Sequence, residues 1–341
     1  MRVLIVRLGS LGDVIHTLPA VAALRRALPD AQLDWLVDKP HQDIVGLVTA
    51  IDARIVLEAR TLKAWVNAAA VLRARRYDAA LDFQGLFKSA LLARASGAKR
   101  VLGFSIWHLR ERGARAFYNE TSEPPNPQTP ERHVIRKNLA LAAKLAPSID
   151  AESSPLEFPL AAVPSGAVEQ VKRALGGEPY AVLNPGAAWP NKRWPPERFS
   201  EVAAFLRARH GLRSVVAWGP GEKMLAEAVV SGSEGAAVMS PALPLVDLAA
   251  LLRDARLMVS GDTGPTHIAG ALGVPIVAPF GPTDPARNGP WDPADIVLSK
   301  FDECACHYQR GCRVPDRWCL GRLPASEMMA AITRRLDAGP R

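Results

Sequence analysis

The stretch Val259-Ser-Gly-Asp-Thr-Gly-Pro-Thr-His-Ile-Ala-Gly-Ala-Leu-Gly-Val-Pro-Ile-Val-Ala-Pro-Phe-Gly-Pro-Thr-Asp-Pro285 decides the fold of this chain. Short apolar runs at 257–259 and 276–278, bounded by Gly and Pro, predict two strands that are buried on both faces of a parallel sheet. Residues 266–272 between them predict one short helix. This order of strand, helix and strand is the repeating unit of an α/β fold.

Small polar residues gather where the first turn of this stretch becomes the helix. They are Asp262, Thr263, Gly264, Thr266 and His267, at the carboxyl end of a strand, where open α/β sheets bind ligands. A helix amino end has unpaired N–H groups and the positive end of the helix dipole, so the pattern predicts a site for a phosphorylated ligand. Each residue also has a purely structural interpretation, because Asp262 or Thr263 could cap the helix, Gly264 could form the turn, and His267 could be a half-buried ring with its partners satisfied.

The length and composition of the chain predict two globular domains. A chain of 341 residues is long for one core, and its 48% hydrophobic and 22% charged residues are typical of a globular protein. Strands alternate with helices from the N-terminus, and the alternation starts again near Tyr180, after a proline-punctuated linker at 147–164. We therefore predict one Rossmann-like domain at 1–155, a second at 165–322, and a C-terminal helix within 323–341.

The charge of +8 and the pI of about 9.6 predict attraction to anions, which include nucleic acid, a phosphorylated substrate and an anionic membrane face. No zinc-finger spacing, recognition-helix pattern or aromatic-basic RNA motif is present in the sequence, so nucleic acid is the weaker interpretation. No apolar run reaches the length of a bilayer span, and the N-terminus lacks the pattern of a signal peptide. We expect a cytoplasmic protein.

Four cysteines fall late in the chain, at Cys304, Cys306, Cys312 and Cys319, with His307 beside them. The cluster is compatible with reduced thiols, with a redox-labile loop or with a local metal site, although C-x-C is shorter than most zinc hooks. A structural disulfide is disfavoured in the cytosol.

Three loops that follow strands in the second domain carry its candidate ligands, at 185–194, 219–222 and 261–267. They supply Lys192 and Arg193 for a diphosphate, while Glu222 could accept hydrogen bonds from sugar hydroxyls. The sequence has no P-loop Lys-Ser/Thr and no D-x-D cluster, so we expect neither phosphoryl transfer from a triphosphate nor a catalytic metal or other cofactor.

In the first domain, a glycine loop at 8–13 leads into a helix, but its G-x-x-G spacing does not match the dinucleotide fingerprint. Asp13 at the end of this loop is either a helix N-cap or a general base. A base here, opposite the diphosphate site, would give in-line displacement with inversion. Pro19 predicts that the helix either starts after Thr17 as its cap or is kinked.

Several motifs, in order along the chain, resemble the ADP-heptose:lipopolysaccharide heptosyltransferases. They are Arg7-Leu-Gly-Ser-Leu-Gly-Asp-Val-Ile-His-Thr-Leu-Pro19, Asp82-Phe-Gln-Gly-Leu-Phe-Lys-Ser-Ala90, Asn184-Pro-Gly-Ala187 with Lys192-Arg-Trp-Pro195, and Asp262-Thr-Gly-Pro-Thr-His267 with Phe280-Gly-Pro-Thr-Asp-Pro285. The resemblance implies a GT-B architecture, in which two Rossmann-like domains with parallel sheets face a cleft. It places the acceptor on the first domain and the sugar nucleotide on the second.

The resemblance also implies roles for individual residues. Asp13 would be the catalytic base and Lys192 would steady the diphosphate. The implied nucleotide-sugar site comprises Gly186, Ala187, Ala188, Lys192, Arg193, Glu222, Asp262, Thr263, Gly264 and His267, and the implied acceptor site comprises Ser10, Leu11, Gly12, Gln84 and Lys88. Family members often have hydroxyl residues where this chain has Ala187 and Ala188, so phosphate contacts there would come from backbone N–H groups alone.

The implied reaction is inverting transfer of heptose from ADP-heptose to a lipopolysaccharide core–lipid A acceptor, by an enzyme peripheral to the inner membrane. The motif at 82–90 resembles the branch that adds the first heptose to Kdo, whereas the cysteine-bearing tail resembles the branch that adds the second, so the acceptor stays open. Two alternatives also stay open: a GT-B sugar-nucleotide epimerase, and a basic module that binds nucleic acid or membrane.

Overall fold

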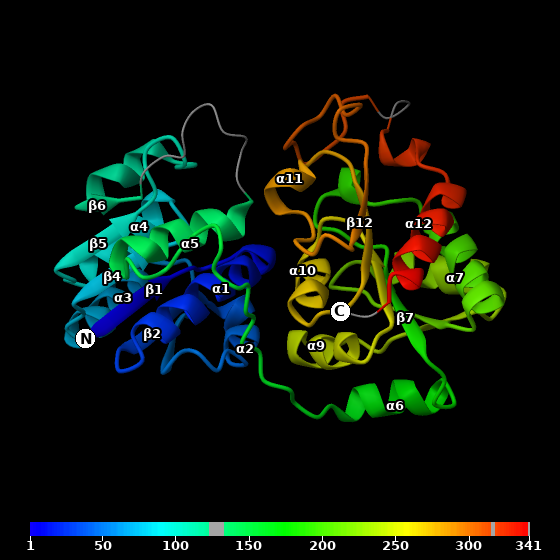
Figure 1. Cartoon of the computed structure of the whole chain (residues 1–341), viewed down its shortest axis with the longest axis horizontal. Coiled ribbons are helices and arrows are strands. Elements are labelled where there is room, and N and C mark those ends of the chain that lie inside the picture. Colours follow the sequence, from blue (N-terminus) through cyan, green and yellow to red (C-terminus); the bar gives the residue numbers. More distant parts are fainter. Residues whose placement is uncertain (123–132, 315–317, 340–341) are drawn as a thin grey trace. The chain divides into compact units, whose positions relative to one another are not determined.

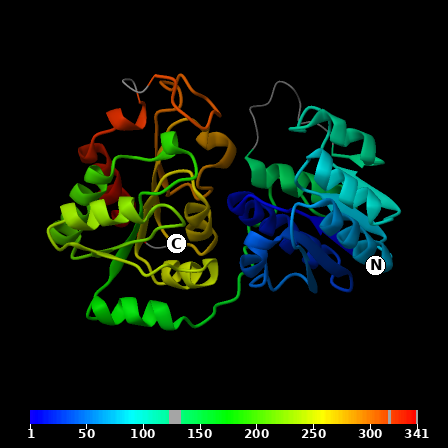
Figure 2. The same cartoon turned by 180° about the vertical axis from the view of Figure 1, so that it is seen from behind.

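The computed structural model describes residues 1–122, 133–314 and 318–339. The chain divides into two compact units, Met1–Ala161 and Ala162–Arg341, and each unit is built on its own six-stranded sheet (Figures 1 and 2). None of the helices in these ranges combines the length and apolar character that a bilayer span requires. The sequence also predicts a proline-rich loop at 119–130, of which 123–130 lie outside the described residues.

The sheet of the first unit has the strand order β3-β2-β1-β4-β5-β6, and every neighbouring pair is parallel. Its strands are β1 (Arg2–Val6), β2 (Gln32–Asp38), β3 (Ala53–Leu57), β4 (Ala79–Asp82), β5 (Arg100–Gly103) and β6 (Glu120–Thr121). Its helices are α1 (Leu11–Ala27), α2 (Gln42–Val45), α3 (Leu62–Ala74), α4 (Phe87–Ala95) and α5 (Val134–Leu145), with 3-10 turns η1 (Lys39–His41) and η2 (Arg112–Phe117).

The second unit repeats the same topology, with the order β12-β11-β10-β7-β8-β9. Its strands are β7 (Tyr180–Asn184), β8 (Arg213–Val216), β9 (Ala237–Met239), β10 (Leu257–Ser260), β11 (Ile276–Phe280) and β12 (Ile296–Ser299). Its helices are α6 (Gly166–Ala174), α7 (Pro196–His210), α8 (Lys223–Gly232), α9 (Leu245–Arg253), α10 (Gly264–Ala271), α11 (Pro285–Asn288) and α12 (Ala325–Asp337), with 3-10 turns η3 (Pro190–Lys192) and η5 (Leu320–Arg322).

Both sheets therefore have the Rossmann strand order, in which the direction of strand addition reverses beside the first strand. The reversal lies between β1 and β4 in one unit and between β7 and β10 in the other. Right-handed crossovers then place helices on both faces of each sheet, and α1 packs against α5 while α3 packs against α4. The predicted α/β class with two Rossmann-like parallel sheets is confirmed, and each reversal marks the expected position of a ligand.

The start of α1 differs from one sequence expectation. The helix begins at Leu11 with Ser10 as its N-cap, so the alternative in which Thr17 caps it is wrong. Pro19 lies inside the helix, where it lacks an N–H for the backbone ladder. The Thr17 hydroxyl instead donates to the carbonyl of Asp13 at 2.8 Å. The cap at Ser10 places Asp13 in the first turn.

Candidate active site

In the second unit, a buried carboxylate organises the carboxyl edge of the sheet. Asp262, two residues beyond β10, accepts hydrogen bonds from Lys192 Nζ, Thr283 Oγ1 (2.8 Å) and Asn288 Nδ2 (2.8 Å), and its Oδ1 lies 3.2 Å from His267 Nε2. Burial by itself would raise the pKa of Asp262, but the hydrogen bonds and charges of His267 and Lys192 hold that pKa well below its usual range. The carboxylate therefore stays ionised and fixes the Lys192 ammonium.

Lys192 is held from a second side by an aromatic ring. It ends η3, and its Nζ lies 4.4 Å from the ring centroid of Trp189, within the range of a cation–π contact. Its side chain is 14% exposed. Because one carboxylate and one ring already fix it, the ammonium can meet an incoming phosphate with little further loss of side-chain entropy.

A chain of hydroxyl and amide groups links the loops after β7 and β10. Asn184 Nδ2 donates to the Gly186 carbonyl at 3.1 Å and to Ser260 Oγ at 3.0 Å. The Thr263 hydroxyl lies 3.1 Å from both Ser260 Oγ and Thr266 Oγ1. Thr263 is the N-cap of α10, so this chain fixes the amino end of the helix against the neighbouring strand. Gly264 is the first residue of that helix.

Glu222 and the loop after β7 contain the other predicted residues of the donor site. Its Oε2 accepts from the Gly219 N–H at 3.0 Å, and a Cβ placed on Gly186 would come within 2.0 Å of the same oxygen. Residue 186 must therefore be glycine for Glu222 to approach. Arg193 Nε donates to the carbonyl of Ala187 at 3.0 Å, which closes the loop after β7, while Ala188 is exposed on that loop.

In the first unit, Asp13 lies in the first turn of α1, at the carboxyl edge of the sheet. Its Oδ1 pairs with Arg7 Nη2 at 2.6 Å, and its Oδ2 accepts from the hydroxyl and N–H of Ser10 at 3.0 and 3.3 Å. The N-cap interpretation of Asp13 is thus corrected, because Ser10 is the N-cap and Asp13 is the third helical residue. The Asp13 side chain remains 39% exposed, so it can also reach a ligand.

Arg7 is a site residue to which the sequence assigned no role. It is 6% exposed at the end of β1, and its guanidinium donates to the Phe83 carbonyl as well as to Asp13. A buried arginine needs such partners, and here they aim it at the Asp13 carboxylate. The only sequence signal was its place at the head of the motif at 7–19.

The predicted acceptor residues lie on two elements. Leu11 and Gly12 begin α1 beside Ser10, and Gln84 is tied to the same loop because its Oε1 accepts from the Leu8 N–H at 2.7 Å. Lys88 lies in the first turn of α4, with its Nζ 5.8 Å from the ring centroid of Trp65 on α3.

Asp82 shapes the turn that carries Gln84. Its fully buried carboxylate accepts from Tyr118 Oη (2.7 Å), Ser89 Oγ (2.8 Å) and the N–H groups of Gln84 (2.9 Å) and Gly85 (3.3 Å). Burial raises the pKa of Asp82 against the lowering effect of these neutral donors. Tyr118 comes from a distant part of the chain, so its role could not be predicted from the motif at 82–90.

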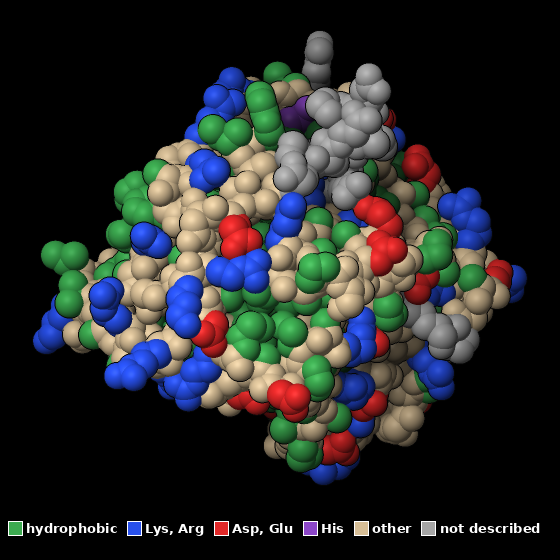
Figure 3. Space-filling view, turned by 60° about the vertical axis from the view of Figure 1, so that its left-hand side comes forward, with side chains coloured by type: hydrophobic (Ala, Val, Ile, Leu, Met, Phe, Trp, Pro, Cys, Tyr) green, Lys and Arg blue, Asp and Glu red, His purple; other side chains and the backbone are tan. Residues whose placement is uncertain are grey.

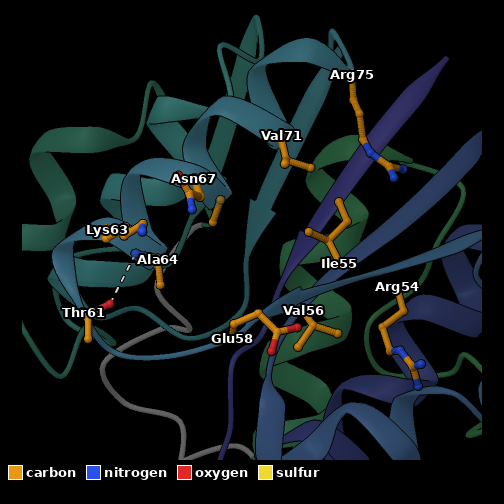
Figure 4. A pocket seen from close by; sticks show the side chains of 11 residues that line it. Arg54, Ile55, Val56, Glu58, Thr61, Lys63, Ala64, Asn67, Val71 and Arg75 are labelled. Carbon is orange, nitrogen blue, oxygen red and sulfur yellow. Dashed lines mark hydrogen bonds between the residues drawn. The ribbon is translucent and has the colours of Figure 1, made fainter.

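A separate pocket of about 480 Å³ lies at the outer edge of the first sheet (Figure 4). Lys63, Ala64, Asn67 and Val71 on α3 form one wall, and residues 54–56 of β3 form the other. None of the predicted site residues lines it.

The cysteines make close sulfur contacts with one another. Cys306 Sγ lies 3.8 Å from Cys312 Sγ and accepts from the Arg313 N–H at 3.1 Å, and all four cysteines are free thiols. His307 stacks on Phe301 with ring centroids 4.0 Å apart. Within the described ranges, no three His, Cys, Asp or Glu side chains are arranged to hold a metal ion.

Comparison with known proteins assigns the chain to a family. Residues 65–316 match glycosyltransferase family 9 (heptosyltransferase). The chain belongs to this family. A Pseudomonas aeruginosa protein named lipopolysaccharide heptosyltransferase 1 is 34% identical over 327 residues, which cover 92% of this chain and 87% of the relative.

Solved structures are similar along the whole chain. The Escherichia coli heptosyltransferase WaaC with ADP has a TM-score of 0.74 and 27% identity, over 99% of this chain and 98% of that chain. The same enzyme with ADP-2-deoxy-2-fluoro heptose has a TM-score of 0.73 over 99% of both chains. The GT-B architecture implied by the resemblance is confirmed, and this glycosyltransferase family is favoured over the epimerase and binding-module alternatives.

Proposed function

We propose that this enzyme transfers heptose from ADP-heptose to the Kdo residue of a lipopolysaccharide core–lipid A acceptor, with inversion at the anomeric carbon. The observation that carries the proposal is the buried Asp262, which fixes the Lys192 ammonium beside the amino end of α10. A cation and a helix amino end are the groups that a leaving diphosphate needs.

The donor binds the second unit in this proposal. Lys192, Arg193 and the amino end of α10 contact the diphosphate, and Glu222 accepts from the ribose hydroxyls. The solved complexes of the Escherichia coli relative with ADP and with an ADP-heptose analogue support a donor of this class.

Asp13 is the proposed general base. Arg7 holds Oδ1, so Oδ2 is the oxygen that takes the proton from the acceptor hydroxyl, and Ser10 helps to orient it. As that proton moves to Asp13, the acceptor oxygen forms a bond to the anomeric carbon, and the bond from this carbon to the β-phosphate oxygen breaks. ADP leaves with the electron pair from the face opposite the attacking oxygen, so the configuration inverts.

Positive charge from the protein balances the leaving group, so the reaction requires no divalent metal. We expect the rate to be unchanged in EDTA, measured as ADP release. A rate that collapses in EDTA and recovers with Mg²⁺ or Mn²⁺ contradicts this mechanism, whereas recovery with zinc alone would direct attention to the cysteines.

The acceptor is proposed to be Kdo rather than the first heptose. Two observations support this choice: the motif at 82–90, and the name heptosyltransferase 1 of the relative that is 34% identical. A lipid-linked acceptor places the enzyme at the cytoplasmic face of the inner membrane as a peripheral protein, and the net charge of +8 favours an anionic surface.

One experiment tests donor and acceptor together. Purified protein is incubated with ADP-heptose and either Kdo-lipid A or an acceptor that already carries the first heptose, and ADP release and product mass are measured. Product from Kdo-lipid A alone supports the proposal, and product from the heptosylated acceptor alone moves the enzyme to the second step. Epimerised donor without transfer restores the epimerase alternative, and thermal stabilisation by GDP- or UDP-sugars in place of ADP-sugars contradicts the donor assignment.

A further inference from the structure

Helices α3 and α4 leave apolar side chains in contact with water on one side of the first unit. Leu62 and Val66 on α3 are 82% and 59% exposed, and Phe87 and Leu91 on α4 are also exposed. Each pair is spaced by four residues, so its members are neighbours on one side of their helix.

The topology makes the two helices share a face. Both are crossovers in the same direction, from β3 to β4 and from β4 to β5, and they pack against each other. Their outward sides therefore point away from the same face of the sheet. The segment before η2 adds Trp107, which is 76% exposed, and η2 itself packs on α4.

The charges on these elements are almost all positive. Helices α3 and α4 together contain four basic residues, Lys63, Arg73, Lys88 and Arg94, and no Asp or Glu. Residues 104–117 add Arg110, Arg112 and Arg115 against the single acid Glu111, whose carboxylate accepts the Phe87 N–H at 2.7 Å. Figure 3, in which the left-hand side of Figure 1 comes forward, shows exposed hydrophobic side chains together with Lys and Arg side chains and with Asp and Glu side chains.

We infer that this surface, formed by α3, α4 and residues 104–117 and here called the α3–α4 surface, docks on the anionic cytoplasmic leaflet of a membrane. Exposed apolar side chains among basic ones are the composition of helices that lie in a lipid interface. Lys and Arg would meet lipid phosphates while their apolar stems and Leu62, Val66 and Trp107 enter the boundary of the acyl region. Neither helix is long enough to span, so the contact is peripheral.

The inference deepens the proposed function, because a lipid-linked acceptor is presented at such a surface. Asp13 and Gln84 lie at the carboxyl edge of the same sheet, and α4 begins three residues after Gln84. An enzyme docked through α3 and α4 would therefore hold its acceptor edge close to the lipid headgroups.

Vesicle co-sedimentation tests this surface without any lipopolysaccharide. The full chain should partition onto phosphatidylcholine vesicles that contain phosphatidylglycerol and bind much less to phosphatidylcholine alone, and added salt should weaken the binding. The double variant Leu62→Ser/Val66→Ser should lose roughly tenfold in partition, because two interfacial apolar side chains are removed. Lys63→Ala and Arg94→Ala should each lose about fivefold.

Matched variants in the second unit provide the controls. Met224, 81% exposed on α8, is changed to Ser, and the exposed Arg209 on α7 is changed to Ala, and neither change should alter partition. Equal binding to neutral and anionic vesicles, wild-type binding by the Leu62→Ser/Val66→Ser variant, or equal loss in the controls overturns the inference. An assay of heptose transfer to a deacylated acceptor in solution separates the two proposals. Transfer by a protein that does not bind vesicles refutes only the docking surface. Vesicle binding by a protein that does not transfer heptose refutes only the proposed function.

Discussion

Asp13 and Asp262 both lie beyond the carboxyl end of a strand that borders a reversal of strand order, β1 for Asp13 and β10 for Asp262, and each lies within or just before a helix. Their surroundings differ. Asp262 is 6% exposed and engages Lys192, Thr283, Asn288 and His267, whereas Asp13 is 39% exposed and its carboxylate engages Arg7 and Ser10. Similar positions at a sheet edge thus make one carboxylate a fixed counter-ion and leave the other exposed to a ligand.

A third carboxylate shows what decides the ionisation of a buried aspartate. Asp82 and Asp262 are both buried, but Asp82 accepts only from neutral donors whereas Asp262 also faces Lys192. The pKa of Asp82 is raised by burial, and the pKa of Asp262 is lowered in spite of burial. Hydrogen bonds from neutral donors offset part of the rise in pKa that desolvation causes, and a partner cation reverses the direction of the shift.

The largest expected effect is on Asp13, and it tests whether this carboxylate is the proton acceptor. Asp13→Asn keeps the shape and one oxygen for Arg7 but removes the base, so turnover should fall by about 10² to 10⁴, or roughly 3–5 kcal/mol of barrier. ADP affinity should be unchanged because the proposed donor site lies on the other unit. Steady-state kinetics and calorimetric ADP binding measure the two quantities.

Asp52→Asn is a matched control for that change. Asp52 is 44% exposed and is paired with Arg25, as Asp13 is paired with Arg7, but it belongs to no candidate site. Its variant should keep wild-type turnover. If Asp13→Asn melts normally and still transfers at close to the wild-type rate, Asp13 is a helix-start residue and the proposed mechanism loses its base.

The second prediction concerns the cation that Asp262 holds. Lys192→Ala should weaken ADP binding by roughly 1.5–3 kcal/mol, the size of a charge-assisted hydrogen bond, and it should lower the free energy of unfolding because Asp262 loses its ammonium partner. Lys172→Ala, which removes an ion-paired lysine from α6 of the same unit, serves as control. Unchanged ADP affinity in Lys192→Ala would remove Lys192 from the donor site.

A smaller effect is expected at Gly186. Gly186→Ala should push Glu222 from its place, because the new Cβ would overlap its carboxylate, and ADP binding should weaken by about 1 kcal/mol. Gly166→Ala is the control, since nothing lies within 4 Å of a Cβ there. Glu222→Gln should reproduce the loss if the carboxylate contacts ribose. A normal affinity in both Gly186→Ala and Glu222→Gln would separate Glu222 from the nucleotide.

The smallest expected effect is the change of the free energy of unfolding with pH, and the sign of that change is the test. Relative to Asp82→Asn, the wild-type chain should gain stability as pH falls from 7 towards about 4. The reason is that the raised pKa of Asp82 makes this carboxylate take up a proton in the folded state before it does so in the unfolded state. Relative to Asp262→Asn, wild-type stability should stay constant over that range and fall only below about pH 4. The reason is that the lowered pKa of Asp262 makes this carboxylate take up a proton in the unfolded state before it does so in the folded state. Urea unfolding at a series of pH values measures both differences. The same sign for both carboxylates would contradict the contrast between them.

Local sequence determined the elements and much of the candidate site. Periodicity and turn residues predicted that the alternation of strands and helices starts again near Tyr180, where β7 begins, and predicted the strand, helix and strand of 257–280 to within two residues. The glycine turns and polar residues after these strands were visible as motifs because parallel strands bring such turns to one edge of a sheet. For that reason Lys192, Asp262 and Glu222 could be named before any contact was known.

Only the tertiary structure decided which group partners which carboxylate. Arg7 directly follows β1 and reaches Asp13 in the first turn of α1, and Tyr118 reaches Asp82 across 36 positions of sequence. Thr283 and Asn288 meet Asp262 in the same way, from beyond β11. A sequence lists the titratable groups, but burial and partner charge depend on long-range packing, and these two quantities set the direction in which the pKa values of Asp82 and Asp262 shift.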